Sequence, residues 1–415
     1  MSQQGFARFV PVLALLGVLL VLAAIYASGN VPLYRSILLA AGMHPYWWPF
    51  LDTDTVLSAA RCIHNGIDAY KVNPCDPLWR PYDYSPLFMG LAYFPVTTAW
   101  IMPVGVLLCF VFLGALLLLP LPRDKGGIAL MTLACTSTIV LFGLERGNNE
   151  LIIFAFSALG AWAIARNRTW GYGALIMAGL LKYFPLLAMA VALRESPKRL
   201  FALAAVSLIL VGTLTAITWH SLIESLANYP ELSPFNETFG AKNAAQGLAR
   251  MLGLPLSTRL TLQGVMTLIA LLLALRLARS PRTGEALARL DQTQQVFLLV
   301  GSLLMIGCFF ASRNIDYRGI HLLLALPALI ALRGGDMPGW LRSAAWLVVA
   351  LLWGNFLLMV TDVFPGKLDQ IIGWLVRELV WWWVIVVLVA LTGRLLWQTP
   401  VVGEVLARLG REPKH

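Results

Sequence analysis

Long apolar runs separated by polar connections dominate the whole chain. Runs of roughly 17 to 25 mainly apolar residues are long enough to cross about 30 Å of hydrocarbon as α-helices. The alternating pattern of membrane-barrel strands is absent from the sequence. We therefore predict an all-α polytopic membrane protein, a single domain over residues 1–415, with helical spans at about 10–28, 99–121, 128–143, 150–166, 171–193, 199–218, 260–279, 294–311, 318–333, 339–360 and 376–396.

The run at 171–193 does not fit a single crossing of the membrane. Basic clusters flank it on both sides, and one crossing would carry one of these clusters to the outer face. Its middle reads KYFP (182–185), where Pro185 cannot continue the hydrogen-bond ladder of a helix. Two short helices that turn at KYFP return both clusters to one side, and non-helical backbone at that depth needs a polar cavity or protein around it. The run therefore predicts a break at KYFP and a cavity near Lys182. Counting its two halves gives 12 helical pieces in all, whereas a single span at 171–193 would give 11.

Basic clusters fall on alternate connections between the runs. The clusters at 166–168, 194–199 and 276–289 alternate with polar, non-basic loops, of which 29–98 and 219–259 are the longest. The positive-inside rule then places both termini in the cytoplasm and the polar loops, with their short helices, outside. We expect a multi-pass protein of a bacterial inner membrane whose functional face is the outer one.

Composition and charge agree with this membrane assignment. The chain is 59% hydrophobic and 13% charged, with a net charge of +10. A positive charge of this size can indicate nucleic-acid binding, but the sequence contains no basic block, and membrane topology explains where the basic residues lie. We therefore expect no nucleic-acid partner.

The stretch LDTDTVLSAARCIHNGIDAY (51–70) opens the polar part of the first outer loop with two carboxylates. Apolar residues follow at helical spacing, and Gly66 is suited to end a helix. We predict a helix with Asp52 or Thr53 as its N-cap. On one interpretation Asp52 and Asp54 only cap and support this helix. On the other, one of them is a general base that removes a proton from a hydroxyl at the membrane surface.

Further motifs follow this stretch in a fixed order. Each pairs a polar or glycine-rich element with the start or the end of an apolar helix. They are Ala59 and Ala60, seven and eight residues after Asp52, the Gly-x-Asp-x-Tyr element at 66–70, the aromatic-proline element YDYSPLF (82–88), LERGNNE (144–150), and the helix GALIMAGLLKYFP (173–185).

This order and spacing resembles the GT-C membrane glycosyltransferases, and most closely glycosyltransferase family 87, the polyprenol-phosphate-sugar-dependent mannosyltransferase-like proteins. The resemblance covers about residues 50–200, with a weaker match at RNIDYRGIHLLLALP (313–327). Ser85 departs from the family's usual Tyr-Pro-Pro element. The resemblance implies a GT-C-like bundle and an enzyme that moves a sugar from a polyprenyl-phosphate donor to a lipid or glycan acceptor, with inversion, on the outer face.

The family's acid in the first outer loop acts as the base. By its spacing to Ala59 and Ala60, this role maps onto Asp52, with Asp54 a close second. The sequence requires no metal or other cofactor, because its acids are isolated and form no cluster of oxygen ligands.

A departing phosphate needs cations aimed at it. Lys182 lies within an apolar segment, where a lysine is functional by default, although it can also reach toward the membrane surface. Arg146 has Glu145 and Glu150 as alternative partners. The remaining candidates are Arg313 and Arg318, which bracket Asp316 as an alternative ion-pair partner, and His321.

Polar side chains on the same face are candidates for contact with the sugar. An ordinary solvated loop would carry similar residues, so both interpretations stay open. The candidates are Tyr84, Asn148, Tyr183, Asn236 and Lys242.

The five cysteines contain no CxxC metal pattern. Cys62 and Cys75 share the first outer loop and can form a disulfide if that loop faces an oxidising compartment.

Two other classes of function compete with a glycosyltransferase. A lipid transporter or flippase would place charges near the midplane of several helices, yet apart from Lys182 the predicted spans carry almost none. An envelope polysaccharide polymerase or ligase shares an outer cavity but typically has its large loop late in the chain. Here the largest outer loop comes between the first two spans.

Overall fold

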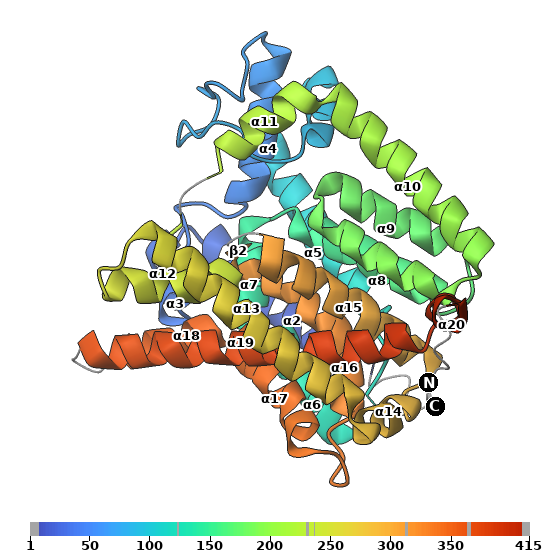
Figure 1. Ribbon diagram of the computed structural model, residues 1–415. Coiled ribbons are helices and arrows are strands. Elements are labelled where there is room, and N and C mark those ends of the chain that lie inside the picture. Colours follow the sequence, from blue (N-terminus) through green and yellow to red (C-terminus); the bar gives the residue numbers. More distant parts are fainter. Residues whose placement is uncertain are drawn as a thin grey trace.

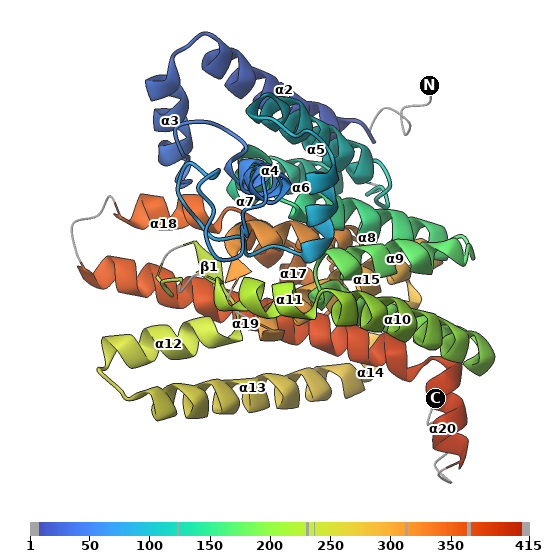
Figure 2. The same ribbon diagram turned by 90° about the horizontal axis from the view of Figure 1, so that it is seen from above.

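The computed structural model describes residues 8–122, 124–229, 232–235, 237–311, 314–362 and 367–408. Within these residues the chain is almost entirely helical, as the apolar runs predict (Figures 1 and 2). The α-helices are α2 (Val10–Ala27), α3 (Val31–Ala40), α4 (Leu51–His64), α5 (Ile101–Leu116), α6 (Lys125–Cys135), α7 (Thr138–Arg146), α8 (Glu150–Ile164), α9 (Trp170–Leu181), α10 (Pro197–Ile217), α11 (Trp219–Ala227), α12 (Ala241–Met251), α13 (Leu256–Arg279), α14 (Pro281–Ala288), α15 (Gln292–Ala311), α16 (Leu322–Ala331), α17 (Gly339–Leu352), α18 (Gly354–Asp362), α19 (Lys367–Trp397) and α20 (Pro400–Arg408).

Short 3₁₀ helices and one small sheet complete the fold. The sheet is an antiparallel pair in which Thr238 faces Ile315 and Phe239 faces Asn314. These elements are η1 (Pro86–Tyr93), η2 (Thr98–Trp100), η3 (Phe184–Arg194), η4 (Asp316–His321), β1 (Thr238–Phe239) and β2 (Asn314–Ile315).

The protein is a multi-pass membrane protein by the length and composition of its helices. Among the described residues, six helices are long and apolar enough to span a membrane, and two bent pairs, α6–α7 and α17–α18, raise this number to eight. The predicted spans at 150–166, 171–193 and 318–333 are also helical but consist of shorter pieces. The sequence therefore located the apolar helices correctly. Fewer of these helices than the predicted spans are long enough to cross a membrane.

α15 is the central helix of the bundle. Most of its side chains are buried, and it packs against α8, α16, α19 and η3. Gly301 allows the close approach to α16, because a Cβ atom at this position would lie 2.7 Å from the backbone nitrogen of Ala325. By contrast, α10 has no buried side chain. A helix that is apolar all round can take either position, since lipid and protein core are both apolar surroundings.

The connections that carry basic clusters meet at one end of the molecule. Gln292 contacts Asn167 at 3.2 Å, Arg289 pairs with Asp336, and Arg333 pairs with Asp124. α14 and α20 lie at this end, and α12 and α18 lie at the opposite end (Figures 1 and 2). This grouping is the one that alternate basic connections predict.

The predicted break at KYFP is confirmed. α9 ends at Leu181, Lys182 has an extended backbone (φ −152°, ψ 140°), and η3 begins at Phe184. The hydroxyl of Tyr172, near the start of α9, donates to Glu195, just after η3, at 3.0 Å. The two helices therefore run back along each other and return the chain to the side from which it came.

α4 forms as predicted, but the expected N-cap is wrong. The helix begins at Leu51, one residue before Asp52, and its N-cap is Phe50, which caps no amide with its side chain. Phe50 has φ +67°, a conformation that is uncommon outside glycine. Asp52 and Asp54 instead lie in the first turn, where the helix dipole favours negative charge.

A disulfide between Cys62 and Cys75 ties the end of α4 to the loop that follows it. Arg61 supports the same junction by donating to the carbonyl oxygen of Cys75 at 3.0 Å. Farther along the loop, the backbone amide of Tyr82 donates to the carbonyl oxygen of Ala69, five residues after the end of α4, at 2.9 Å. These contacts hold a long polar loop in one conformation.

Replacing both Cys62 and Cys75 with serine is expected to loosen this loop by about 3 kcal/mol, because the disulfide closes a separation of 13 residues. Limited proteolysis between residues 65 and 80 should be faster in the variant. Reducing agent should accelerate cleavage of the wild type and leave the variant unchanged. Equal cleavage of oxidised wild type and variant would contradict this role.

Candidate active site

A cavity of about 500 Å³ lies where the polar connections meet. The loop around Lys182 contributes to it, as the break in the 171–193 run predicts. The residues that line it are Asp52, Thr55, Arg80, Pro81, Asp83, Tyr84, Phe142, Arg146, Lys182, Asn228, Tyr229, Leu232, Ser233, Glu237, Thr238, Ile315, Tyr317 and Arg318.

Asp52 is held in this cavity by Asn148. The side-chain amide of Asn148 donates to Asp52 Oδ2 at 2.6 Å, and its own Oδ1 accepts from the backbone amide of Glu150 at 2.9 Å. Asn148 is fully buried, so its amide is fixed. The hydroxyl oxygen of Tyr84 lies 3.5 Å from the nitrogen of this amide. One carboxylate oxygen of Asp52 is therefore oriented by a neutral donor while the side chain lines the cavity.

The start of α4 is fastened to the turn that carries Asn148. Phe50 donates its backbone amide to the carbonyl oxygen of Glu145 at 2.6 Å, and the Thr53 hydroxyl donates to the carbonyl oxygen of Gly147 at 2.7 Å. Gly147 has φ +56°, and a Cβ atom there would lie 2.4 Å from Thr53 Oγ1. Only glycine fits this position, and it brings the turn close enough to orient Asp52.

Asp54 lies away from the cavity. Its side chain is 2% exposed and its nearest cation is Arg61, at 3.7 Å. Burial raises the pKa of the Asp54 carboxyl, and Arg61 partly opposes this. Two residues along a helix correspond to about 200° of rotation, so the two acids face different surroundings.

Glu150 joins two of the expected cations. Its Oε1 lies 2.6 Å from Lys182 Nζ and 3.0 Å from Arg318 Nε, and its carboxylate is fully buried. Lys182 therefore does not reach toward the membrane surface but points into the cavity, 5.6 Å from the ring of Tyr84. A single buried acid serves two cavity-lining cations, so these three side chains together carry one net positive charge.

His321 also binds Glu150 but does not line the cavity. Its Nε2 lies 3.0 Å from Glu150 Oε2, and the ring is fully buried. The structure thus places His321 outside the lining of the cavity, and its contact with a donor phosphate stays a prediction. The imidazole lies behind the acid and supports it.

Arg146 lines the cavity from the end of α7. Its Nη2 donates to the carbonyl oxygen of His44 at 2.9 Å, and its guanidinium lies 5.0 Å from the centre of the Phe142 ring. Glu145 is 3.7 Å away, a weak ion pair. The guanidinium therefore remains available to an anion in the cavity.

The alternative pairing of Arg318 with Asp316 does not form in the structure. Arg318 turns to Glu150 and to Asn314, whereas Asp316 lies 3.5 Å from Arg377 of α19. Arg313 lies outside the described residues. The two side chains of η4 diverge because its tight turn points them to opposite sides.

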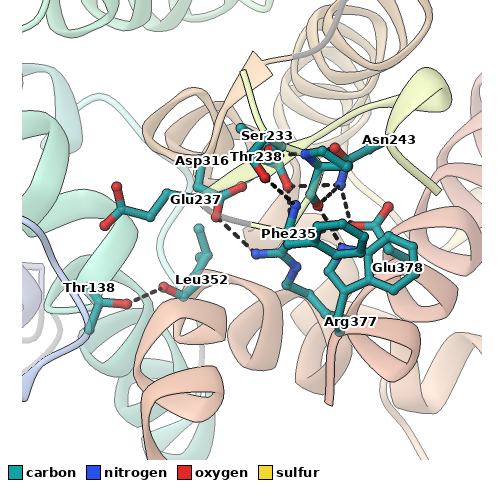
Figure 3. A network of polar contacts seen from close by, with 12 residues as sticks. Thr138, Ser233, Phe235, Glu237, Thr238, Asn243, Asp316, Leu352, Arg377 and Glu378 are labelled. Atoms are coloured by element: carbon teal, nitrogen blue, oxygen red, sulfur yellow. Dashed lines mark hydrogen bonds and ion pairs between the residues drawn. The ribbon is translucent and has the colours of Figure 1, made fainter. Parts of the chain in front are cut away.

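A buried polar network behind the cavity fixes the β1–β2 pair (Figure 3). Arg377 donates to the carbonyl oxygen of Thr238 at 2.9 Å, and Asn243 donates to Glu378 at 2.8 Å. Burial raises the pKa of Asp316 to about 7, against the lowering effect of Arg377. The network ties α19 and α12 to β1 and to Asp316, the first residue of η4, which also carries Arg318.

Arg80 and Asp83 are cavity residues that the sequence did not single out. Arg80 donates to Thr55 at 2.5 Å and to Asp76 at 2.8 Å. Burial and the nearby charge of Asp52 raise the pKa of Asp83 to about 6. Asp83 belongs to the YDYSPLF element and Arg80 precedes it by two residues, so their position near Tyr84, which also lines the cavity, was the available signal.

Two predicted sugar contacts lie elsewhere. The hydroxyl of Tyr183 is 3.2 Å from Thr215 on α10, and Lys242 is exposed on α12; neither lines the cavity. Asn236 lies outside the described residues. A single break in the helix turns Lys182 inward and the next residue, Tyr183, outward.

The chain matches one protein-family model, glycosyltransferase family 87, over residues 84–312. This range is more than half of the 415 residues. It contains Arg146, Glu150 and Lys182, whereas Asp52 precedes it and Arg318 follows it. No curated protein and no solved structure matches the chain.

Replacing Glu150 with glutamine is expected to destabilise the protein by about 3–5 kcal/mol, because Lys182 and Arg318 would lose their shared buried counter-charge. Thermal unfolding in detergent would measure this loss. Asp336→Asn, which removes the exposed pair with Arg289, should leave the unfolding temperature almost unchanged, because solvent screens an exposed ion pair. Equal effects of the two substitutions would contradict a central role for Glu150.

Proposed function

The chain belongs to glycosyltransferase family 87, and from this premise we propose that it transfers a sugar from a polyprenyl-phosphate donor to an acceptor hydroxyl, with inversion. One observation carries the proposal. A carboxylate, Asp52, and three cations, Arg146, Lys182 and Arg318, line the same cavity.

Asp52 is proposed as the general base. Its carboxylate takes the proton from the acceptor hydroxyl as that oxygen forms a bond to the anomeric carbon of the sugar. The bond from the anomeric carbon to the phosphate oxygen breaks, and the polyprenyl phosphate leaves with the electron pair. A single displacement of this kind inverts the anomeric centre. Asn148 supports this role because its amide fixes Oδ2 of Asp52. The other carboxylate oxygen, Oδ1, can then accept the proton.

Lys182 and Arg318 are proposed to bind the donor phosphate. Together they carry up to eight N–H donors, and Glu150 occupies only part of this capacity. Donors that are fixed before the reaction stabilise the charge that develops on the leaving phosphate. Arg146, on the Asp52 side of the cavity, is proposed to contribute a third positive charge.

Asp54 is proposed to support the helix and not to take part in the reaction. Its carboxylate is buried beside Arg61 and does not line the cavity. This distinction between two acids of the same helix turn provides a matched pair for experiments.

The cavity is proposed to face the outer side of the membrane, with both termini in the cytoplasm. The basic connections gather at one end of the molecule, and none of the cavity-lining residues belongs to them. The positive-inside rule assigns the basic end to the cytoplasm. The disulfide in the loop after α4 is also suited to an oxidising compartment.

Asp52→Asn is expected to lower the rate of sugar transfer by about 10²–10⁴, because a general base contributes roughly this factor. Asp54→Asn is the matched control and should retain the rate within about tenfold. The measurement is transfer from a panel of polyprenyl-phosphate sugars, in vesicles or detergent, to membrane lipids and glycans.

Collapse of transfer in Asp54→Asn alone would contradict the assignment of the base while keeping the reaction. Absence of transfer from every donor, together with movement of labelled lipid across the bilayer, would favour a transporter and overturn the reaction itself.

Ionisation of Asp83 is expected to weaken donor binding above about pH 6. Its pKa is raised from 3.8 to about 6, so the folded chain holds this proton more tightly, and the added negative charge appears only as pH rises through about 6. The donor KM should then rise by about threefold between pH 5 and 7, because a like charge enters a cavity that binds phosphate. In Asp83→Asn the donor KM should stay flat over this range, and a rise of equal size in the variant would refute the assignment.

A further inference from the structure

A second cavity, the α2–α5 groove, lies behind the wall that carries Asp52. It measures about 330 Å³, and apolar side chains of α2, α5 and α7 form most of its lining. Leu20 and Phe110 in this lining are 60% and 59% exposed. Because α2 and α5 are candidate membrane spans, these side chains lie where lipid chains would cover them.

The end of the groove beside α3 carries a buried carboxylate. The side chain of Glu145 is 5% exposed, and its Oε1 lies 3.5 Å from the hydroxyl of Tyr34. Among the described residues, its Oε2 has no hydrogen-bond partner, and the Nε of Arg146 lies 3.7 Å from it. Buried carboxylate oxygens are normally hydrogen-bonded, and acids within membrane helices usually mark functional sites. The groove therefore offers an acceptor oxygen to a hydrogen-bond donor on a ligand.

The groove and the cavity share one wall. At the start of α4, the N-cap Phe50 lines the groove and Asp52 lines the cavity. At the end of α7, Glu145 lines the groove and Arg146 lines the cavity. The backbone hydrogen bond from Phe50 to Glu145 joins the two chain segments in this wall. The backbone of Glu145, at the polar end of the groove, is therefore hydrogen-bonded to the residue two positions before the proposed base.

The left-handed residue Phe50 is the central piece of this wall. Its ring fills the space beside Gly105 of α5, where a Cβ atom would lie 2.2 Å from Phe50 Cγ. Non-glycine residues at positive φ cost energy and are concentrated at functional sites. The fold thus holds an aromatic side chain between a lipid-accessible groove and the polar cavity.

We propose that the α2–α5 groove binds the lipid chain of the acceptor, and that a hydroxyl of its headgroup donates a hydrogen bond to Glu145. This inference rests on the proposed function and specifies its acceptor as a hydroxyl-bearing lipid. The charge of Glu145 opposes the phosphate of the donor, which the cations Lys182 and Arg318 attract on the other side of Asp52. The two lipid substrates would then approach Asp52 from separate sides.

Photolabelling tests the occupant without requiring turnover. The probes are a glycosyl diacylglycerol and a polyprenyl phosphate, each with a photoactivatable group in its apolar chain, applied to the full chain in vesicles. The glycosyl diacylglycerol should label peptides of α2 and α5, and Val106→Trp, which fills the groove, should reduce this labelling about tenfold. Leu268→Trp on the exposed face of α13 is the control and should leave labelling unchanged.

Labelling of α2 and α5 by polyprenyl phosphate instead would overturn the proposal, as would labelling by glycosyl diacylglycerol that is unchanged in Val106→Trp. Since labelling requires no sugar transfer, these outcomes are distinct from a failure of the proposed reaction.

Kinetics test the role of Glu145. With a lipid acceptor that supports transfer, Glu145→Gln should raise the acceptor KM by about tenfold, because hydrogen bonds to charged groups are stronger than those to neutral amides, and should leave the donor KM unchanged. A rise in the donor KM alone, or an unchanged acceptor KM in a variant that unfolds at the wild-type temperature, would refute it.

Discussion

The buried contact of Glu150 with Lys182 and Arg318 is the interaction on which the site depends. Two cations in an apolar bundle are costly unless a carboxylate neutralises part of their charge. Glu150 does so from the first turn of α8, where the helix dipole also favours an acid. It thereby joins the start of α8, the break between α9 and η3, and the turn of η4. These three segments are separate in the sequence and meet at the carboxylate of Glu150.

The turn that ends in Glu150 also sets the position of Asp52. Gly147 allows α4 to approach, and Asn148 binds the carboxylate. One short segment, residues 145–150, therefore positions both the base and the phosphate-binding cations of the proposed mechanism. Because a reaction of this kind depends on the geometry between base and leaving group, a shared support of this kind is a physical advantage. The network of Arg377 and Thr238 gives Arg318 a second support from behind.

The sequence predicted those features that follow from local chemistry. Apolar length located the helices, Pro185 located the break, and the lysine within an apolar run located the cavity. Helical spacing of apolar residues predicted the helix that carries Asp52, and family resemblance suggested Asp52 as the base. The family match over residues 84–312 agrees with that resemblance.

Features that depend on distant partners were not predictable. In the sequence, Glu150 resembles an ordinary acid in the first turn of a helix. Its contact with His321 of η4, 171 residues later, is visible only in the structure. Asp316 finds Arg377 across 61 residues, although two arginines lie nearer in the sequence. The N-cap prediction failed because contacts with α7 hold Phe50 in a left-handed conformation that its own side chain does not favour.

The position of the donor phosphate tests the central claim most directly. A cryo-EM structure of the protein with a bound polyprenyl-phosphate sugar, determined with Asp52→Asn to prevent turnover, would locate it. The account predicts the phosphate within hydrogen-bonding distance of Lys182 and Arg318, with the anomeric carbon directed toward position 52. A phosphate bound away from both cations, with their contacts to Glu150 unchanged, would contradict it.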